Sequence, residues 1–408
     1  MMLAPDSAVP HRDELLDGDR VAELLSGRLL DGEPVEACRR KFAKYRVGDG
    51  LRVVYRIVAG GREHHVAARG FAPGASAVAY HRALSAAVPA PPLRPVVHVP
   101  ELDAVFWTFP NDRRLSTLPL FAGRSGTLDR LVGRARVTPR LVAYSAERSA
   151  SAECATEDGR VLAYAKVHTG DVAERERRRL EDARAAESDC LHVPRVIGTS
   201  ALDGALAVEA VPGRSLEALD ESELPEALRR LGCALATLHD RSPLPSERFE
   251  RLDIERLAKA VSVIARARPD AGPGAAELLA RLLGDLGDAA GPHVYLHGDA
   301  NLRNAIFDDD RVTLIDFEDA SAGPAAADLG QVLARLRAAR LTGAINATTE
   351  TELAAAVLEG YAEIRATPPE RSLRWHMGAS VLARVALPAV SRVRPSLLVN
   401  LRPLLEGA

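Results

Sequence analysis

The chain has 408 residues, of which 47% are hydrophobic and 27% are charged, and its formal net charge is −3. This length predicts two or three domains with sizeable cores, and the composition excludes wholesale disorder and a small disulfide-stapled protein. A chain without a basic excess lacks the charge that binds nucleic acid or an anionic membrane surface, so we expect neither as a partner.

Neither the N-terminus nor the most apolar segment has the pattern of a membrane protein. Residues 1–14 contain no apolar leader, and residues 379–390 are interrupted by Arg384 and Pro388. That segment is also shorter than the ~20 residues of a membrane span. The cysteines are widely spaced and form no C-x-x-C pair, so we expect reduced thiols at Cys38, Cys154, Cys190 and Cys233. These features predict a cytoplasmic protein.

The N-terminal half of the chain contains the same plan twice. In each copy two β-rich runs are joined by a short turn, a third follows a Gly-Gly or Asp-Gly turn, and a helical segment precedes two more short strands. The last strands are expected at residues 104–108 and 205–209. Near the end of its third strand the second copy has Lys166, one of only four lysines in the chain, where the first copy has Arg69. We therefore predict a strand, strand, strand, helix, strand, strand unit that occurs twice.

Helical apolar spacing follows the second copy. It predicts helices over residues 219–238, 255–266 and 274–286, and a mainly helical region from residue 351 to the C-terminus. The changes in pattern near Gly133 and Gly213 suggest domains over residues 1–133, 134–213 and 214–408.

An Asp-rich turn between apolar triplets at residues 305–307 and 313–315 predicts a β-hairpin. If the hairpin is symmetric about residue 310, Asn304 faces Asp316, with Cβ atoms about 4.5–5.5 Å apart. An amide oxygen and a carboxylate at that separation suit Mg²⁺, which completes its shell with water and phosphate oxygens. Asp299 enters the hairpin from the preceding loop and can accept a hydroxyl proton. These residues are the parts that phosphoryl transfer needs.

The order His297-Gly298-Asp299-x₄-Asn304, followed by Ile315-Asp316, resembles the signature of the aminoglycoside phosphotransferase and choline kinase group. The resemblance spans residues 140–408. It implies an α+β, protein-kinase-like fold with two lobes, a small sheet-based N-lobe and a helical C-lobe that carries the catalytic hairpin. Residues 1–133 are then an additional α+β domain similar to a second, degenerate kinase N-lobe.

The same resemblance implies roles for the motif residues. Asp299 is the catalytic base, Asn304 and Asp316 ligate Mg²⁺, and Lys166 contacts the inner phosphates of ATP. His297 braces the loop through hydrogen bonds. A helix carboxylate is expected to hold the lysine, and Glu176 matches the family spacing best, with Glu181 as the second choice.

The remaining nucleotide contacts carry weaker signals. No Gly-rich phosphate loop is present, so the amides of residues 145–149 or the hydroxyl of Ser149 are expected to cover the phosphates. The backbone of Glu209 and Val211 occupies the place of the family's hinge and is expected to contact adenine. Glu318 either lies near the metal or the acceptor or is a plain structural carboxylate.

These features predict an ATP- and Mg²⁺-dependent kinase that phosphorylates a hydroxyl of a sugar, aminoglycoside or similar polar metabolite. The alternative is a catalytically silent pseudokinase that acts as a binding scaffold. An acidic segment at residues 217–226 is either an ordinary helix surface or an attraction for a cationic acceptor. The acceptor, the choice between ATP and GTP, and the oligomeric state have no signal in the sequence.

Overall fold

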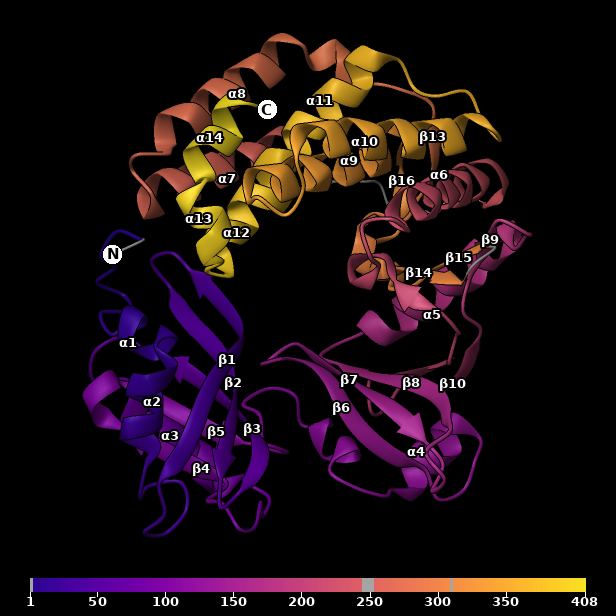
Figure 1. Ribbon diagram of the computed structural model, residues 1–408. Coiled ribbons are helices and arrows are strands. Elements are labelled where there is room, and N and C mark those ends of the chain that lie inside the picture. Colours follow the sequence, from indigo (N-terminus) through magenta and orange to yellow (C-terminus); the bar gives the residue numbers. More distant parts are fainter. Residues whose placement is uncertain (1–2, 244–252, 309–310) are drawn as a thin grey trace.

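The computed structural model describes residues 3–243, 253–308 and 311–408. Two five-stranded antiparallel sheets lie side by side, and a mainly helical region contacts both, so that the chain closes into a ring (Figure 1). Within the described residues, no helix combines the length and apolar character needed to span a membrane.

The first sheet follows two short helices, α1 (Arg12–Leu16) and α2 (Gly18–Leu25). Its strands have the spatial order β1-β2-β3-β5-β4, and α3 (Ser76–Ser85) connects the third strand to the last two. The strand bounds are β1 Val35–Arg46, β2 Gly50–Ala59, β3 Arg62–Gly70, β4 Val96–Val99 and β5 Ala104–Thr108.

The second sheet repeats this topology. After α4 (Gly126–Val132), its strands have the order β6-β7-β8-β11-β10, and α5 (Val172–Ala183) occupies the place of α3. The strand bounds are β6 Thr138–Ser145, β7 Ser149–Ala155, β8 Val161–His168, β10 Val196–Ser200 and β11 Ala205–Glu209. The predicted internal duplication is therefore confirmed. The domain boundaries near Gly133 and Gly213 stay predictions.

Strand register shows that Arg69 and Lys166 occupy equivalent positions. Lys166 pairs with Ser151 on one side and Leu206 on the other. Arg69 pairs with Arg52 and Val105, which stand at the corresponding places of their strands. The two copies thus share a backbone position but carry a different cation there.

The rest of the chain forms the helical region and two small sheets. One sheet has the order β12-β14-β15-β9, and β13 pairs with β16. Pro225 stands in the first turn of α6, so this helix begins later than predicted. The strands are β9 Leu191–His192, β12 Arg214–Ser215, β13 His293–Leu296, β14 Ala305–Asp308, β15 Arg311–Leu314 and β16 Ser321–Pro324. The helices are α6 Leu224–Arg241, α7 Ile254–Ala267, α8 Gly272–Gly284, α9 Ala326–Leu341, α10 Ala347–Ala362, α11 Glu370–Ser380, a π-helix Val381–Ala386, α12 Leu387–Ser391, α13 Pro395–Val399 and α14 Leu401–Glu406.

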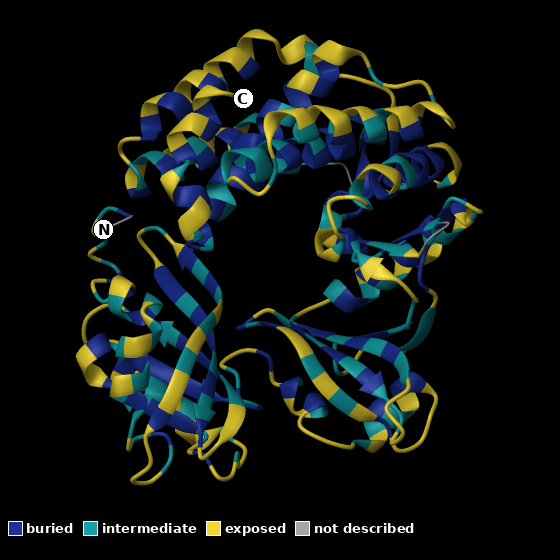
Figure 2. Ribbon diagram, viewed as in Figure 1, coloured by how far each residue is buried: buried dark blue, intermediate teal, exposed yellow. Residues whose placement is uncertain are grey.

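The first sheet is buried on both faces, and each face belongs to a different core. Tyr55 and Phe106 on one face pack in a core shared with the C-terminal helices, which contribute residues such as Ile264 and Leu398. Trp107 on the other face packs in a core shared with the second sheet, including Val167. A third core joins α5 to the helices around α6 and α9. Figure 2 shows buried residues on the strands of the first sheet and exposed residues on the outer turns of the helices.

Two of the four cysteines differ from expectation. Cys190 and Cys233 are bonded to each other, because α6 packs beside β9 and brings their Cα atoms to 6.1 Å across 43 residues of sequence. The prediction of four reduced thiols is therefore wrong for this pair. Cys38 and Cys154 are free, and burial raises the pKa of the Cys154 thiol to about 11.

Candidate active site

One buried aspartate holds the loop that follows β13. Asp328, in the first turn of α9, accepts hydrogen bonds from the backbone N–H groups of His297 (2.7 Å) and Gly298 (3.0 Å). The Nε2 atom of His239 lies 3.2 Å from the same carboxylate. Burial raises the pKa of Asp328, but the hydrogen bond and charge of His239 more than offset this and lower it. The loop therefore begins at an ionised anchor.

Gly298 allows this loop to cross the backbone at Asp319. Its φ is +78°, and a Cβ built at this position would lie 2.0 Å from the carbonyl oxygen of Asp319. Any side chain would clash there, in addition to the cost of the left-handed conformation. The glycine of the H-G-D motif is thus explained by packing between two loops.

His297 joins the same two loops through its ring. Nδ1 lies 3.4 Å from the backbone N–H of Asp299, and Nε2 lies 3.0 Å from the carbonyl oxygen of Ile315. These contacts assign the tautomer that carries its proton on Nε2. The side chain is fully buried and packs against the ring of Phe317. This geometry fits the bracing role expected for His297.

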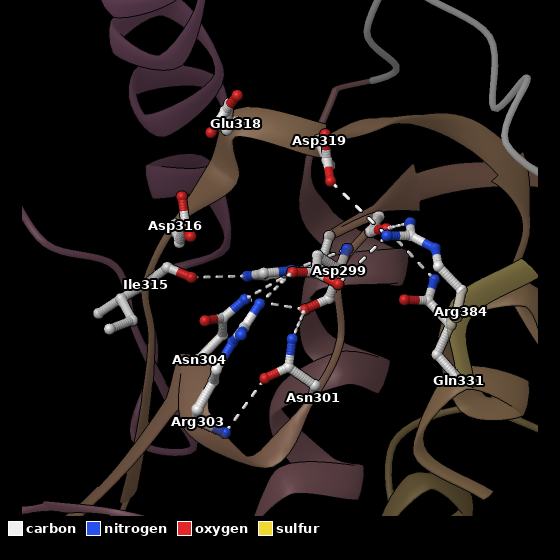
Figure 3. A network of polar contacts seen from close by, with 12 residues as sticks. Asp299, Asn301, Arg303, Asn304, Ile315, Asp316, Glu318, Asp319, Gln331 and Arg384 are labelled. Atoms are coloured by element: carbon white, nitrogen blue, oxygen red, sulfur yellow. Dashed lines mark hydrogen bonds and ion pairs between the residues drawn. The ribbon is translucent and has the colours of Figure 1, made fainter. Parts of the chain in front are cut away.

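Asp299 lies at the centre of a polar network (Figure 3). Its Oδ1 contacts Nη1 of Arg384 at 3.2 Å, and its Oδ2 contacts Arg303 (3.3 Å) and the amide nitrogen of Asn304 (3.2 Å). Burial raises the pKa of Asp299, but the positive charges of Arg384 and Arg303 outweigh it and lower the pKa to about 2. The carboxylate is ionised across the physiological pH range and its two oxygens are fixed in direction.

Lys166 forms a second charged group with two carboxylates. Its Nζ contacts Glu176 on α5 and lies 3.2 Å from Oδ1 of Asp316. Burial alone lowers the pKa of Lys166, whereas the charges of Asp316 and Glu176 raise it above its ordinary value, so the ammonium stays charged. Glu181, the second candidate, instead pairs with Arg177 on the surface of α5. Glu176 is therefore the partner of Lys166.

The hairpin pairs differently from the prediction. Asp308 pairs with Arg311 and Ala305 with Leu314, so the centre lies between residues 309 and 310 rather than at 310. Asn304 consequently meets Ile315, whose N–H donates to its carbonyl oxygen at 2.9 Å. The prediction that Asn304 and Asp316 are directly opposed is wrong. Only residues 309 and 310 separate the paired strands, so each partner lies one residue earlier than a centre at residue 310 requires.

Asn304 and Asp316 still lie on adjacent segments (Figure 3). Asn304 donates from Nδ2 to the carbonyl oxygen and Oδ2 of Asp299, so its amide oxygen is on the side away from that residue. Asp316 has a left-handed backbone, with φ +68°, and turns its carboxylate toward Lys166. The two loops and β8 thus bring an amide, two carboxylates and the ammonium of Lys166 to one site.

The comparison with known proteins agrees with this geometry. The family model named APH, the phosphotransferase enzyme family, matches residues 158–373, more than half of the chain. The chain belongs to the APH phosphotransferase family. It is thus a phosphotransferase, and the match begins in the second sheet and ends in α11. No curated protein matches the chain.

Solved structures of APH enzymes share the fold of this family member. A thermostable mutant of aminoglycoside phosphotransferase APH(4)-Ia, in ternary complex with ADP and hygromycin B, aligns over 71% of this chain and 97% of its own, with 14% identity and a TM-score of 0.52. Another mutant of that enzyme, in complex with AMP-PNP and hygromycin B, aligns over 69% and 97%, with 16% identity and a TM-score of 0.53. At this identity the likeness shows the fold alone, and it confirms the predicted α+β, protein-kinase-like fold.

Sequence reasoning missed the role of Arg384 in this APH-family site. It lies in the π-helix and is buried, and besides Asp299 it contacts the carbonyl oxygen of Gly298 and Oδ2 of Asp319 (3.7 Å). A π-helical turn is rare and is frequent at functional sites. In the sequence this arginine only interrupts an apolar segment. That interruption is the single signal that could have drawn attention to it.

The turn before Ser149 is bound to the first sheet's domain. The N–H of Glu147 donates to Asp112 at 2.9 Å, and that of Arg148 donates to Ser145 at 3.0 Å. Two of the amides expected to cover phosphates are therefore already engaged, and that expectation fails for them. Ser149 begins β7, opposite His168, with a half-buried side chain.

The structure places Glu318 beside this turn and Glu209 at the end of β11. Glu318 pairs with Arg148, so its carboxylate links the two loops as a structural ion pair. The carboxylate of Glu209 accepts a hydrogen bond from the backbone N–H of Arg195 at 2.8 Å. This contact engages the side chain, whereas the expected adenine contact is one of the backbone. Val211 follows outside any strand and is half-buried. The adenine contacts of Glu209 and Val211 stay predictions.

The donor set fits Mg²⁺ bound together with a nucleotide. Among the described residues, no group of three or more His, Cys, Asp or Glu side chains could hold a metal unaided. Asn304 and Asp316 supply two hard oxygen donors, and Asp316 retains 37% of its side-chain exposure. Mg²⁺ bound to nucleotides commonly takes one or two protein ligands and completes its shell with phosphate and water.

Proposed function

We propose that this chain is an ATP-dependent small-molecule kinase. It transfers the γ-phosphoryl group to a hydroxyl of a sugar, aminoglycoside or related polar metabolite, with Asp299 as the base and Mg²⁺ held by Asn304 and Asp316. The observation that carries the proposal is the contact of Lys166 with both Glu176 and Asp316, next to the loop that fixes Asp299. The APH(4)-Ia complexes contain ADP or AMP-PNP, which agrees with ATP as the donor here.

Each residue has a distinct task in this proposal. Lys166 and Asp316 bind the nucleotide's phosphates, directly and through Mg²⁺, which neutralises negative charge on the phosphates when bound. Asp299 accepts a hydrogen bond from the acceptor hydroxyl and aligns its oxygen. A carboxylate with a pKa of about 2 is a weak base, so it takes the proton late, as the new P–O bond forms.

Substitution of Asp299 tests the assignment of the base. Asp299→Asn keeps the shape and one acceptor oxygen but removes the charge, so we expect turnover to fall by about 10²–10⁴-fold, as for loss of a general base. ADP release, coupled to detection of the phosphorylated acceptor, measures it. A variant with near-normal turnover of a confirmed acceptor removes Asp299 from this role.

Substitution of Asp316 tests the metal assignment. Asp316→Asn is expected to weaken Mg²⁺-dependent ATP binding in calorimetry, with Asp308→Asn, an exposed hairpin residue, as the control. Unchanged affinity for MgATP contradicts the ligand assignment. If ATP and Mg²⁺ together fail to bind the wild-type chain, the alternative of a silent scaffold is favoured.

A further inference from the structure

A cavity of about 810 Å³ adjoins the loop of residues 297–304 that carries Asp299, which we call the catalytic loop. Asn301, Leu302 and Arg303 form its wall next to Asp299, and residues 40–43 of β1 form another wall. The rest of the lining comes from residues 216–224, from α9 and the residues that follow it, from α10 and from the segment 392–397, and Figure 1 shows the tip of β1 beside α12. Neither Lys166 nor Asp316 lines it. The volume suits a small metabolite.

The charge of this lining is almost entirely positive. Glu217 is the one carboxylate among the lining residues, and the other members of the acidic segment lie outside the cavity, where Glu223 pairs with Arg214 and Glu226 with Arg229. The cations of the lining, which we call the arginine cluster, are Arg40, Lys41, Arg303, Arg335, Arg392 and Arg394. The acidic segment therefore contributes a single carboxylate, against six cations, to this cavity.

Three members of the arginine cluster form no ion pair with a described residue, although the charge of Asp299 acts on Arg335 and Arg392 and that of Glu217 on Arg394. Within the described part of the chain, no carboxylate lies within ion-pair distance of Arg335, Arg392 or Arg394. On the same helix as Arg335, by contrast, Arg337 and Arg340 both pair with Glu350. Burial and the repulsion of Arg394 lower the pKa of Arg335 to about 10, and burial with the charge of Arg303 does the same for Arg392.

Backbone geometry keeps two of these side chains together. Val393, between Arg392 and Arg394, has φ +48°, which a β-branched residue adopts only at a cost. Its carbonyl oxygen accepts a hydrogen bond from Arg40 at 3.0 Å, so β1 of the first sheet's domain ties this segment in place. The structure thus holds several half-buried cations in mutual repulsion next to the proposed base, an arrangement that an anion would stabilise.

We infer that the acceptor carries an oxyanion, a phosphate or a carboxylate, in addition to the hydroxyl that is phosphorylated. This inference rests on the proposed function and names its substrate class. The planar guanidinium group of arginine binds such oxyanions through paired, charge-assisted hydrogen bonds. Arg303 contacts both the cavity and Asp299, at 3.3 Å, so an anion on the cluster places a nearby hydroxyl at the base. The positive lining disfavours a polycationic aminoglycoside in this cavity, so the inference narrows the acceptors of the proposed function to anionic ones.

The test is calorimetry on the full chain saturated with Mg²⁺ and AMP-PNP, with inorganic phosphate, glucose 6-phosphate, gluconate, glucose and glucosamine as probes. We expect at least one of the sugar anions to bind about tenfold or more tightly than glucose or glucosamine, because each charge-assisted hydrogen bond contributes that much. The two sugar anions distinguish phosphate from carboxylate recognition, and inorganic phosphate shows whether the oxyanion alone suffices. Equal or tighter binding of glucose or glucosamine, or no binding of any anion, overturns the inference.

Substitutions in the arginine cluster test whether the anionic probe binds there. Arg335→Gln and Arg392→Gln are each expected to weaken the anionic probe about tenfold. Arg374→Gln, on the exposed face of α11, is the control and leaves it unchanged. Because the first two substitutions relieve repulsion, their melting temperatures should not fall, which separates lost binding from lost folding. Unchanged affinity in both overturns the inference. Failure of MgATP to bind the wild-type chain overturns the proposed function instead.

Discussion

Glu147 offers a sharp test of how the first sheet's domain is attached. This carboxylate lies in the turn before Ser149 with only 4% of its side chain exposed, and three arginines of the first domain surround it. Arg113 binds it through two hydrogen bonds of 2.6 and 2.7 Å, Arg69 lies at 3.1 Å and Arg52 at 3.8 Å. The substitution Glu147→Gln keeps the shape but leaves three cations facing one another.

The expected loss of stability follows from burial. Removal of one partner from a buried ion pair costs about 3–5 kcal/mol. The arginines retain 14–36% of their side-chain exposure, so water screens part of their repulsion. We therefore expect Glu147→Gln to lower the free energy of unfolding by about 3 kcal/mol. Glu153→Gln is the control, because its partner Arg140 is 69% exposed and such surface pairs contribute about 1 kcal/mol or less.

Urea denaturation followed by circular dichroism measures the free energy of unfolding of both variants. The dependence of this free energy on pH is a second measurement. Burial raises the pKa of Glu147, but Arg113 and the other arginines outweigh it and lower the pKa. Its contribution is therefore complete above the ordinary glutamate pKa of about 4.3 and is lost as pH falls through the folded pKa. The wild-type chain should lose this stability in acid, and Glu147→Gln should not. If Glu147→Gln costs no more than Glu153→Gln, the reasoning is refuted.

Two further substitutions test the catalytic loop. Arg384→Gln removes the largest charge that lowers the pKa of Asp299, so the acid limb of the kcat/KM profile should move to higher pH, whereas a purely structural role predicts lower activity with an unmoved profile. Gly298→Ala should lower the free energy of unfolding by about 3 kcal/mol, because its Cβ would meet Asp319. At Gly343, where φ is +76° and no atom lies within 4 Å, the same change should cost only about 1 kcal/mol. Equal losses at the two glycines in thermal unfolding would show that the clash is not the cause.

The duplicated sheet and the catalytic loop could be predicted because their signals are local. Hairpin turns and strand alternation marked both copies, and the H-G-D motif with Asn304 lies within eight residues. Lys166 was visible because lysine is rare in this chain. Glu176 was predicted from its spacing in the family pattern along the expected helix. The structure selects it over Glu181 because Glu176 lies on the buried side of α5.

Other features depend on contacts that no local pattern encodes. The hairpin register was missed by one residue, since the apolar triplets allow a centre at residue 310 or between residues 309 and 310. Arg384 meets Asp299 across 85 residues of sequence, and the arginine cluster gathers side chains from β1, the catalytic loop, α9 and the segment after α12. Cys190 and Cys233 likewise meet only through the packing of α6.

The two cores of the first sheet have a mechanical consequence. Two lobes joined by a single connection can rotate about it, but here a third body adheres to both, through Trp107 and Val167 on one side and through Tyr55 and Ile264 on the other. Three bodies joined in a ring can move relative to one another in fewer ways than three bodies joined in a row. Separation of the lobes therefore requires sliding at one of these apolar seams, so the added domain limits how far the site opens for nucleotide and acceptor to exchange.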